Sequence, residues 1–330
     1  MAHATMRAVR MHRHGGPEEM IVDEIPVPQP APTQVLIRVH AAGVNWADAH
    51  RRRGMFYPQP TVLPFTMGGE FAGVIEAVGA EVSRFREGDA VFALHNGGGY
   101  AEYAVAEESA LIAAPAGLDP ALGVALVVQG LSAVAILKDC ARLQPRESVF
   151  VQAAAGGVGL LAVQLAKIYG AGTVIASAST EEKRAVTREH GADVAVDCTA
   201  DGWAEEAREA LGGSGVDVVL EMTGGEVFAK SLDLLADFGR MVVYGLASGE
   251  GSPMRLDHHI GRNIAVRTFY LEPYLSDAQF RSQTMAELAS FVTDGRLTPV
   301  MGGRYPLEEA HELHRRMEAR ATFGKLLVVP

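Results

Sequence analysis

The 330-residue chain is poor in cysteine and in basic residues, and both shortages exclude whole classes of protein. Its two cysteines, Cys140 and Cys198, cannot build a disulfide framework or a thiolate cluster that holds a structural metal. Lysine and arginine number 29 against 40 acidic residues, and the net charge of −11 argues against a nucleic-acid partner, because phosphate binding needs a basic face. A small diffusible substrate fits this composition better.

The chain also lacks an apolar run at its start. Residues 1–10 contain no stretch long enough for a signal peptide or a membrane span. We therefore expect a cytoplasmic protein without a membrane partner. With 48% hydrophobic residues, the chain is long enough to form two domains with separate cores.

The pattern of the sequence changes near residue 121. Before it, short β-type runs are broken by glycine and proline, which is typical of an irregular, mainly β domain. After it, apolar strands alternate with helical patterns, which indicates a parallel sheet covered by helices. The last strands of this part are predicted at residues 240–245 and 264–271. Beyond residue 261 the mixed pattern returns. We therefore predict that an α/β domain, residues 123–261, is inserted into a second domain made of residues 1–122 and 262–330.

A glycine-rich turn joins a predicted strand, 149–151, to an apolar helix, 160–166. Such a turn exposes bare N–H groups at the positive end of a helix, where a dinucleotide pyrophosphate binds. The match to G-x-G-x-x-G is imperfect, because Ala154 replaces the first glycine; a tight turn without a ligand is the alternative. The residues expected to contact the cofactor here are Ala155, Gly156, Gly157 and Val158.

The residues at the end of the next predicted strand, 174–177, indicate whether the cofactor is NAD or NADPH. Enzymes that use NAD place an acidic residue there to hold the ribose hydroxyls. This sequence instead has Ser179, followed by the cations Lys183 and Arg184, which suit a 2′-phosphate. We predict NADPH, bound through Ser179 and Lys183. The alternative is a capping box, with Ser179 as the N-cap and Glu182 three residues on.

Three segments of the sequence, taken together with the strand, glycine turn and helix described above, carry a resemblance to a known family. They are Gly69 to Val82 (G-E-x-x-G-x5-G-x-x-V), Asn45 to Gly54 (N-x-x-D-x-x-x-R-x-G) and Ala154 to Gly159 (A-A-G-G-V-G). Together they resemble the quinone oxidoreductase, or zeta-crystallin-like, branch of the medium-chain dehydrogenase/reductase superfamily. The resemblance spans nearly the whole chain in the same order.

This resemblance implies a particular α/β architecture. A GroES-like, mainly β catalytic domain would come from both chain ends, and a Rossmann-type domain with a doubly wound parallel sheet would lie between them. The substrate would bind in the cleft, and two chains would form a homodimer through their nucleotide domains. Zinc enzymes of the superfamily carry Cys at the position of Asn45 and His at that of Gly69, so no zinc is expected here. The paired histidines, His12 with His14, His258 with His259 and His311 with His314, are expected on loops and an exposed helix face.

Without a Lewis acid, the enzyme should favour acceptors that are already electron-poor, such as quinones and α,β-unsaturated carbonyls. The resemblance places Asn45 beside the nicotinamide and the substrate, where its amide could donate to the oxygen that gains charge. Its alternative is a turn-forming Asn. Asp48 is expected as the N-cap of a short helix that runs to Arg53. The family often has tyrosines where this chain has His50 and Phe56, which leaves the proton donor open.

The resemblance transfers further cofactor contacts as positions only. Each has a plainer alternative: a helix start, turn chemistry or an edge strand. At the position of Cys198 the family tends to carry a Tyr near the adenosine phosphate. The transferred cofactor positions are Gln129, Thr223, Tyr244, Gly245, Leu246, Phe269, Leu271 and Lys325.

Three functions remain open at this point. The first is an NADPH-dependent quinone reductase, and the second is an enone or enoyl-thioester reductase on the same fold. A long acyl-CoA substrate would need a basic patch, for which Arg51 to Arg53 is the candidate, with a solvated helix face as the alternative. The third is a non-catalytic NADPH-binding sensor or structural protein, because a fold does not fix a function.

Overall fold

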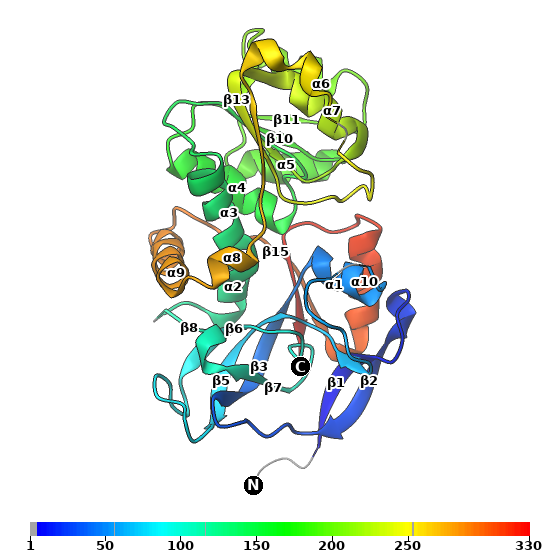
Figure 1. The fold of residues 1–330 in the computed structure, drawn as a ribbon, viewed down its shortest axis with the longest axis vertical. Coiled ribbons are helices and arrows are strands. Elements are labelled where there is room, and N and C mark those ends of the chain that lie inside the picture. The colour runs from blue at the N-terminus through cyan, green and yellow to red at the C-terminus, as the bar shows by residue number, and fades with distance from the viewer. Residues whose placement is uncertain (1–4, 56, 116, 253) are drawn as a thin grey trace. The chain divides into compact units, whose positions relative to one another are not determined.

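A computed structural model describes residues 5–55, 57–115, 117–252 and 254–330. The chain divides into two compact units (Figure 1). One unit consists of Met1–Val128 with Met301–Pro330, and the other is Gln129–Val300. The first unit therefore contains both ends of the chain, and the second is a single insertion.

The first unit is built on antiparallel strands. A small sheet has the order β2-β1-β4 and a larger sheet the order β15-β16-β3-β5-β6-β8, with β7 also paired to β3. The C-terminal strand β16 lies antiparallel to β3 and parallel to β15, so the last residues complete the larger sheet (Figure 1). The strands are β1 (Thr5–Met11), β2 (Met20–Pro26), β3 (Gln34–Val44), β4 (Phe65–Thr66), β5 (Glu70–Val78), β6 (Ala90–Leu94), β7 (Tyr103–Glu107), β8 (Leu111–Ala113), β15 (Met301–Pro306) and β16 (Lys325–Val329).

Apolar side chains from these strands form the core of the first unit. Val35, Ile37 and Phe71 are fully buried in it, and Leu313 from the helix α10 (Ala310–Glu318) packs into the same cluster. Two further helices belong to this unit, α1 (Trp46–Arg52) and α2 (Pro120–Ala125). This mainly β unit corresponds to the GroES-like domain expected from the resemblance.

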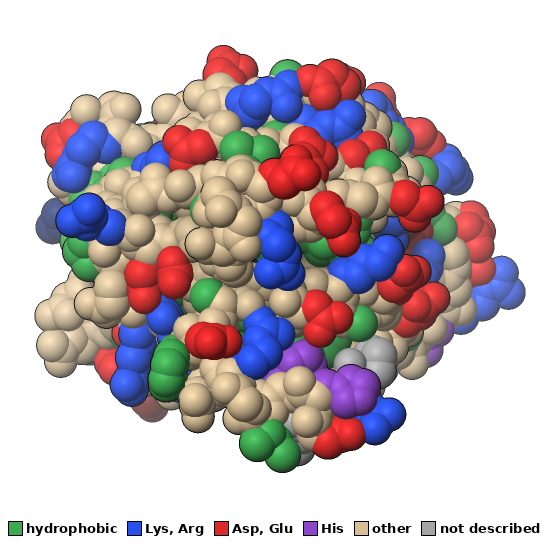
Figure 2. Space-filling view, turned by 90° about the horizontal axis from the view of Figure 1, so that it is seen from above, with side chains coloured by type: hydrophobic (Ala, Val, Ile, Leu, Met, Phe, Trp, Pro, Cys, Tyr) green, Lys and Arg blue, Asp and Glu red, His purple; other side chains and the backbone are tan. Residues whose placement is uncertain are grey.

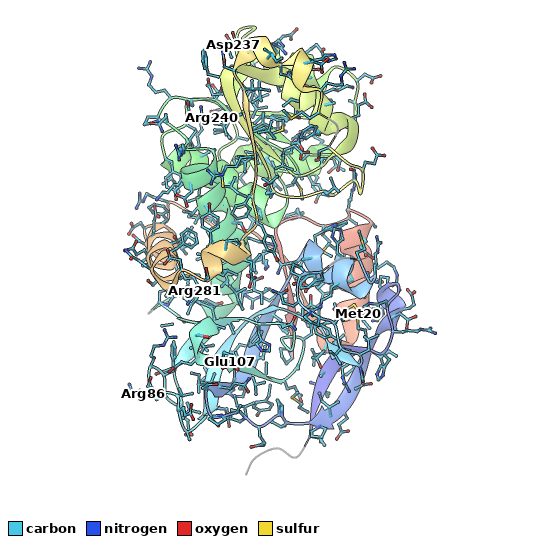
Figure 3. All side chains as sticks on the ribbon, in the orientation of Figure 1. Met20, Arg86, Glu107, Asp237, Arg240 and Arg281 are labelled. Atoms are coloured by element: carbon cyan, nitrogen blue, oxygen red, sulfur yellow. The ribbon has the colours of Figure 1, made fainter. Side chains whose placement is uncertain are left out.

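The second unit contains a parallel sheet in the order β11-β10-β9-β12-β13-β14. Its central strand β9 is fully buried, as expected for a sheet covered on both faces, and Phe150 stacks on Trp203 with ring centroids 5.4 Å apart. On β13, the guanidinium of Arg240 (labelled in Figure 3) donates to the Glu147 carboxylate and to the Ala141 carbonyl. The strands are β9 (Val149–Val151), β10 (Val174–Ser177), β11 (Val194–Val196), β12 (Val216–Glu221), β13 (Leu235–Val243) and β14 (Ala265–Thr268).

Helices contact this sheet from successive crossovers. Helix α4 packs on β9 and β10, α5 on β10 and β11, and α7 on β12 and β13. This is the Rossmann-type arrangement that the alternating pattern predicted. The helices of the unit are α3 (Leu131–Ala135), α4 (Gly157–Ile168), α5 (Glu181–Glu189), α6 (Trp203–Glu209), α7 (Gly225–Leu234), α8 (Glu272–Leu275) and α9 (Ala278–Thr293).

The observed boundary between the units differs from the expected one at residue 261. Segment 262–300 packs within the second unit, because β14 extends the parallel sheet beside β13 and α9 contacts α3. Strand β13 also begins at Leu235, five residues before the predicted start at Arg240. The strand predicted to reach Leu271 ends at Thr268.

One helical stretch, Pro120–Cys140, is long and apolar enough to cross a membrane by composition alone. Its most apolar window is 78% buried within the structure. A buried core helix accounts for this composition.

Candidate functional site

The predicted phosphate turn begins with a strained residue. Two residues after the end of β9, Ala153 adopts a positive φ of 45°, a conformation that costs a non-glycine residue energy and is found at tight functional turns. The Ala154 N–H donates to the Ser177 carbonyl at 2.9 Å, which ties the turn to the next strand. Gly156 then forms the N-cap of α4, so the first N–H groups of that helix are left for a ligand.

Two glycines of this turn have different reasons to be glycine. A Cβ on Gly159 would lie 2.6 Å from the Cα of Ala154 and 2.7 Å from the Ala153 carbonyl oxygen, so close packing of helix and turn requires glycine there. At Gly156 the nearest atom to such a Cβ is the Ala153 carbonyl oxygen at 3.2 Å, and the φ of −74° suits any residue. Packing within the protein therefore requires glycine at position 159, whereas at position 156 a side chain would need a shift of a few tenths of an ångström in the Ala153 carbonyl.

Gln129 lies against the same turn. A Cβ on Gly157 would lie 1.9 Å from the Gln129 Oε1, so the absence of a side chain there makes room for this amide. Gln129 is buried, and within the described part of the chain its Oε1 has no hydrogen-bond partner. An unpaired buried carbonyl oxygen is costly unless a ligand donates to it. Ala155 is a buried residue of the turn itself, and Val158 lies in the first turn of α4.

Ser179 lies exposed just beyond the end of β10, as predicted. The predicted capping box is wrong: the N-cap of α5 is Thr180, whose hydroxyl accepts from the Lys183 N–H. The capping role falls one residue later because α5 begins at Glu181. The Ser179 hydroxyl is therefore not used to cap the helix, and Lys183 occupies the first turn of α5.

The next cation in the sequence, Arg184, forms ion pairs with acidic side chains. Arg184 donates to the Ala178 carbonyl and forms ion pairs with Asp197 at 2.8 Å and Glu181 at 3.1 Å. Burial raises the pKa of the Cys198 thiol to about 12, partly offset by a hydrogen bond with Ser177. At neutral pH this thiol is therefore protonated and packed against β10.

Four of the transferred positions cluster beyond the carboxyl ends of β12 and β13. The Tyr244 N–H donates to the Glu221 carbonyl, a Cβ on Gly245 would contact Met222, and Leu246 is exposed. Thr223 lies just beyond the end of β12. This edge is where ligands bind in open α/β sheets.

Sequence reasoning did not identify Glu221, which lies at the centre of this cluster. Its Oε1 accepts from the N–H groups of Thr223 at 2.8 Å and Gly224 at 2.7 Å, whereas Oε2 is buried without a partner in the described residues. Burial raises the pKa of Glu221. Burial, together with the Glu221 charge, also raises the pKa of Tyr244. The sequence feature that could have identified Glu221 is its place as the last residue of a mainly apolar strand.

Phe269 and Leu271 follow β14 and do not belong to it, contrary to the strand interpretation. The Phe269 N–H donates to the Val243 carbonyl, its ring lies 5.6 Å from that of Tyr274, and Leu271 is the N-cap of α8. The strand ends early because the chain turns into this short helix, whose first turn contains a proline.

In the first unit, Asn45 belongs to a buried polar cluster with Glu70 and Lys325. The Asn45 Nδ2 donates to Glu70 Oε2 at 2.9 Å, and the Lys325 Nζ donates to Asn45 Oδ1 at 3.2 Å and to Glu70 Oε2 at 2.6 Å. The side chains of Glu70 and Lys325 are each 1% exposed. Lys325, predicted as a cofactor contact, is thus an ion-pair partner within its own unit.

The prediction that Asp48 is the N-cap of α1 is wrong, because the N-cap of this helix is Asn45. The Asp48 carboxylate instead accepts from the Asn45 N–H at 2.8 Å, because it stands at the third helical position and reaches back to the cap. It also accepts from the Tyr100 hydroxyl at 3.3 Å, and the His314 Nε2 lies 3.3 Å from the same hydroxyl. Asp48, Tyr100 and His314 therefore form a continuous buried chain that ends at Asn45.

Burial shifts the titration of each member of this chain. It raises the pKa of Asp48 to about 6, against the opposing effect of the Asn45 N–H. Burial, with the adjacent Asp48, raises the pKa of Tyr100 far above its usual value. It lowers the pKa of His314 to about 3, with a contribution from Arg52. At neutral pH the imidazole is neutral, so the Tyr100 hydroxyl can donate to Asp48 while accepting from His314.

The substitution Asp48→Asn should change how stability depends on pH. The folded pKa of about 6 lies above the ordinary 3.8, so between these values the folded state holds a proton that the unfolded state has lost. Folding is therefore favoured as the pH falls through 6, and the wild type should gain about 2 kcal/mol over the variant between pH 7 and about pH 4.5. Urea unfolding of both proteins across this range measures the difference. His314 titrates in both proteins and cancels; a pH-independent difference would contradict the raised pKa.

The three histidine pairs do not share one environment. His12 is half-exposed and its Nε2 lies 2.8 Å from an Asp23 carboxylate oxygen, as expected for a surface histidine. His314 is fully buried, so the expectation of an exposed helix face is wrong there, because Tyr100 and the core of the first unit cover it. Across the described ranges, no group of three or more His, Cys, Asp or Glu side chains is arranged to hold a metal ion.

The run Arg51 to Arg53 is neither a solvated face nor an exposed basic patch. Arg51 donates to the Thr61 hydroxyl and the Pro60 carbonyl, and its guanidinium lies 4.0 Å from the centroid of the Phe65 ring. Arg52 is fully buried and pairs with Glu318. The solvated-face interpretation therefore holds for Arg53 alone, which is half-exposed.

Comparison with known proteins connects both units to one superfamily. The family model described as "Alcohol dehydrogenase GroES-like domain" matches residues 31–116, and the one described as "Zinc-binding dehydrogenase" matches residues 157–291. The chain belongs to the zinc-independent quinone oxidoreductase branch of the medium-chain dehydrogenase/reductase superfamily, and it is an oxidoreductase. The branch and the fold class predicted from the sequence are thereby confirmed.

Individual relatives resemble the chain over almost its full length. Human "Quinone oxidoreductase" is 35% identical over 98% of both chains, and "2-haloacrylate reductase" of a Burkholderia species is 34% identical over 98% of both. Among solved structures, the Escherichia coli quinone oxidoreductase complexed with NADPH superimposes with a TM-score of 0.92 at 30% identity. That match covers 98% of this chain and 100% of the other.

Proposed function

We propose that the chain is an NADPH-dependent, zinc-independent reductase that transfers hydride to a quinone. The observation that carries the proposal is the turn after β9, where Gln129 presents a buried Oε1 without a partner among the described residues, and where packing restricts a side chain at Gly156 less than at Gly159. A dinucleotide explains both features, since its pyrophosphate needs a bare backbone and its polar groups can satisfy a buried acceptor. The similar Escherichia coli quinone oxidoreductase, solved in complex with NADPH, supports this cofactor.

The preference for NADPH over NADH is assigned to Ser179 and Lys183. The Ser179 hydroxyl is not used to cap α5, and no acidic residue occupies the strand end where NAD enzymes hold the ribose. Arg184 is held by Asp197 and Glu181. Lys183 stands in the first turn of α5, close after Ser179 in the sequence, and we assign its cation to the 2′-phosphate.

Lys183→Ala should raise the dissociation constant of NADPH about tenfold and leave that of NADH within about twofold, because only NADPH carries the extra phosphate. Titration calorimetry with each nucleotide measures the two constants. Arg188→Ala, which removes a cation that pairs with Glu181 further along α5, is the control. Equal weakening of both nucleotides would contradict this assignment.

Zinc independence rests on the side chains at the two relevant positions. Asn45 and Gly69 stand where zinc enzymes of the superfamily place a cysteine and a histidine, and the Asn45 amide is engaged by Glu70 and Lys325. An amide is a poor zinc ligand compared with a thiolate. Metal analysis of the purified protein tests the point, and one zinc per chain would overturn it.

NADPH, when bound, supplies the hydride for the reaction. The acceptor gains negative charge on oxygen, and we assign the second N–H of the Asn45 amide as the donor that stabilises it. No Lewis acid is needed for a quinone, because its ring is already electron-poor. A proton from water completes the hydroquinone, so the protein needs no dedicated acid for this substrate.

The second candidate function is reduction of a carbon–carbon double bond conjugated to a carbonyl. The relative named 2-haloacrylate reductase favours it. A long acyl-CoA is disfavoured as the substrate, because Arg51 and Arg52 are buried and cannot form the basic patch that its phosphates need. Small enones are therefore the competing class.

One assay separates these functions. Purified protein is mixed with NADPH and with benzoquinone, an alkenone or crotonyl-CoA, and the loss of NADPH absorbance is followed. We expect the highest kcat/KM with benzoquinone. Faster turnover of the alkenone would favour the second candidate, and NADPH binding without oxidation by any acceptor would indicate a non-catalytic binding protein.

We also propose a cytoplasmic homodimer without nucleic-acid or membrane partners. Strand β14 ends the sheet of the second unit and is largely exposed, so a second copy can extend that sheet. On the face shown in Figure 2, acidic and basic side chains are interspersed without a broad basic area. Sedimentation analysis tests the dimer.

A further inference from the structure

The Asn45 side chain lies between a carboxylate and an ammonium group. Glu70 accepts from its Nδ2 at 2.9 Å and Lys325 donates to its Oδ1 at 3.2 Å, while Glu70 and Lys325 pair directly at 2.6 Å. The three side chains form a closed ring of hydrogen bonds. Both charged members are 1% exposed, so water does not weaken these contacts.

This surrounding permits only one orientation of the amide. Rotating it by 180° would place the NH2 group against the ammonium and the carbonyl oxygen against the carboxylate, and both contacts would be repulsive. In the observed orientation the carbonyl oxygen is occupied and one N–H is bound to Glu70. A single N–H therefore remains for a ligand, and Asn45 acts as a donor.

The ion pair itself is fixed by the sheet. Glu70 starts β5, where it pairs with Gly43 on β3, and Lys325 starts β16 on the other side of β3. A Cβ on Gly43 would lie 2.3 Å from Glu70 Oε2 and 2.7 Å from Lys325 Nζ, so this glycine makes room for the pair. The second oxygen of Glu70 accepts from the Val128 N–H at 2.6 Å. The carboxylate consequently has little freedom to rotate.

We propose that Glu70 and Lys325 are positioning residues, which hold the Asn45 amide as a one-sided donor toward the substrate oxygen. The inference rests on the proposed function, in which Asn45 stabilises that oxygen. A buried ion pair is a weak source of stability compared with apolar packing, so stability alone is a poor account of two charges placed around one amide.

A kinetic cycle tests the coupling between the pair and Asn45. The variants are Asn45→Ala, the charge-free double variant Glu70→Gln/Lys325→Met, and the triple variant that combines them. We expect Asn45→Ala and the double variant each to lower kcat for benzoquinone about tenfold at saturating NADPH. The triple variant should be no more than about twofold slower than Asn45→Ala, because the pair acts through the amide. The NADPH dissociation constant should stay within about twofold throughout.

The matched control removes another buried ion pair of the same unit. Arg52→Met/Glu318→Gln takes away a pair in which Arg52 is fully buried, with no contact to Asn45. This control should lower thermal stability and leave kcat within about twofold of wild type. An equal loss of kcat in this control would overturn the specific role of Glu70 and Lys325.

A second readout does not depend on turnover. The chain has three asparagines, Asn45, Asn96 and Asn263, so 15N-asparagine labelling yields three side-chain amide pairs in an NMR spectrum. The pair that Asn45→Ala removes should exchange slowly with solvent in the wild type and faster in the double variant. Rapid exchange in the wild type, or additive losses of kcat in the cycle, would overturn the positioning role while leaving the reductase function intact. If the wild type failed to oxidise NADPH with any of the acceptors, the proposed function would be overturned, and the positioning role with it.

Discussion

Gly156→Val should raise the dissociation constant of NADPH about 100-fold or more, with the melting temperature within a few degrees of wild type. The added side chain would occupy the space in which a pyrophosphate approaches the N-terminus of α4. The fold accommodates it with a shift of a few tenths of an ångström, because a Cβ at this position meets the Ala153 carbonyl oxygen at 3.2 Å and the backbone has a negative φ. Titration calorimetry and a thermal melt supply the two measurements.

A second glycine controls for this change. A Cβ on Gly251 would have no neighbouring atom within 4 Å, and this glycine lies outside the turn, so Gly251→Val should leave both quantities unchanged. Gly159→Val, in contrast, should destabilise the fold itself, because its Cβ would collide with backbone atoms. Normal NADPH affinity in Gly156→Val would mean that the turn does not bind a dinucleotide.

Lys325→Met should lower the free energy of unfolding by about 3–5 kcal/mol, because the Glu70 carboxylate would stay buried without its cation. The double variant Glu70→Gln/Lys325→Met should recover most of this loss, since no uncompensated charge remains. Denaturant unfolding of the single and double variants measures both effects.

Lys138→Met is the control for the loss of a lysine. Lys138 pairs with Glu287 at 2.6 Å, but its side chain is 43% exposed, so its removal should cost at most about 1 kcal/mol. A double variant as unstable as Lys325→Met would show that packing around the lysine stem, and not the buried charge, determines the loss.

Much of the fold follows from local patterns in the sequence. Buried runs such as Val149–Val151 and the helix after them indicate a parallel sheet with crossovers, because this periodicity arises from local burial. The early start of β13 was missed since its first half contains Asp237 and Phe238, with Phe238 exposed and in a positive-φ conformation. In this half only Leu235 pairs with β12, and the regular pairing with both β12 and β14 starts at Arg240.

One part of the candidate site could be predicted from local sequence and another part could not. The glycine turn is contiguous, so its residue types alone predict a phosphate-binding N-terminus. The Asn45 cluster depends on Glu70, 25 residues away, and on Lys325, 280 residues away, which only the pairing of β3, β5 and β16 brings together. Likewise, the burial of Arg52 depends on Glu318, 266 residues further along. No sequence window contains such partners.

The Lys325 ammonium also determines what it would take to convert this protein into a metalloenzyme. Restoring Cys at position 45 and His at position 69 would supply two ligands, but a divalent cation there would approach a positive charge that already neutralises Glu70. Repulsion between the two cations would oppose loading. An engineered zinc site would therefore require replacement of Lys325 as well, so that metal and lysine are alternative sources of positive charge beside residue 45.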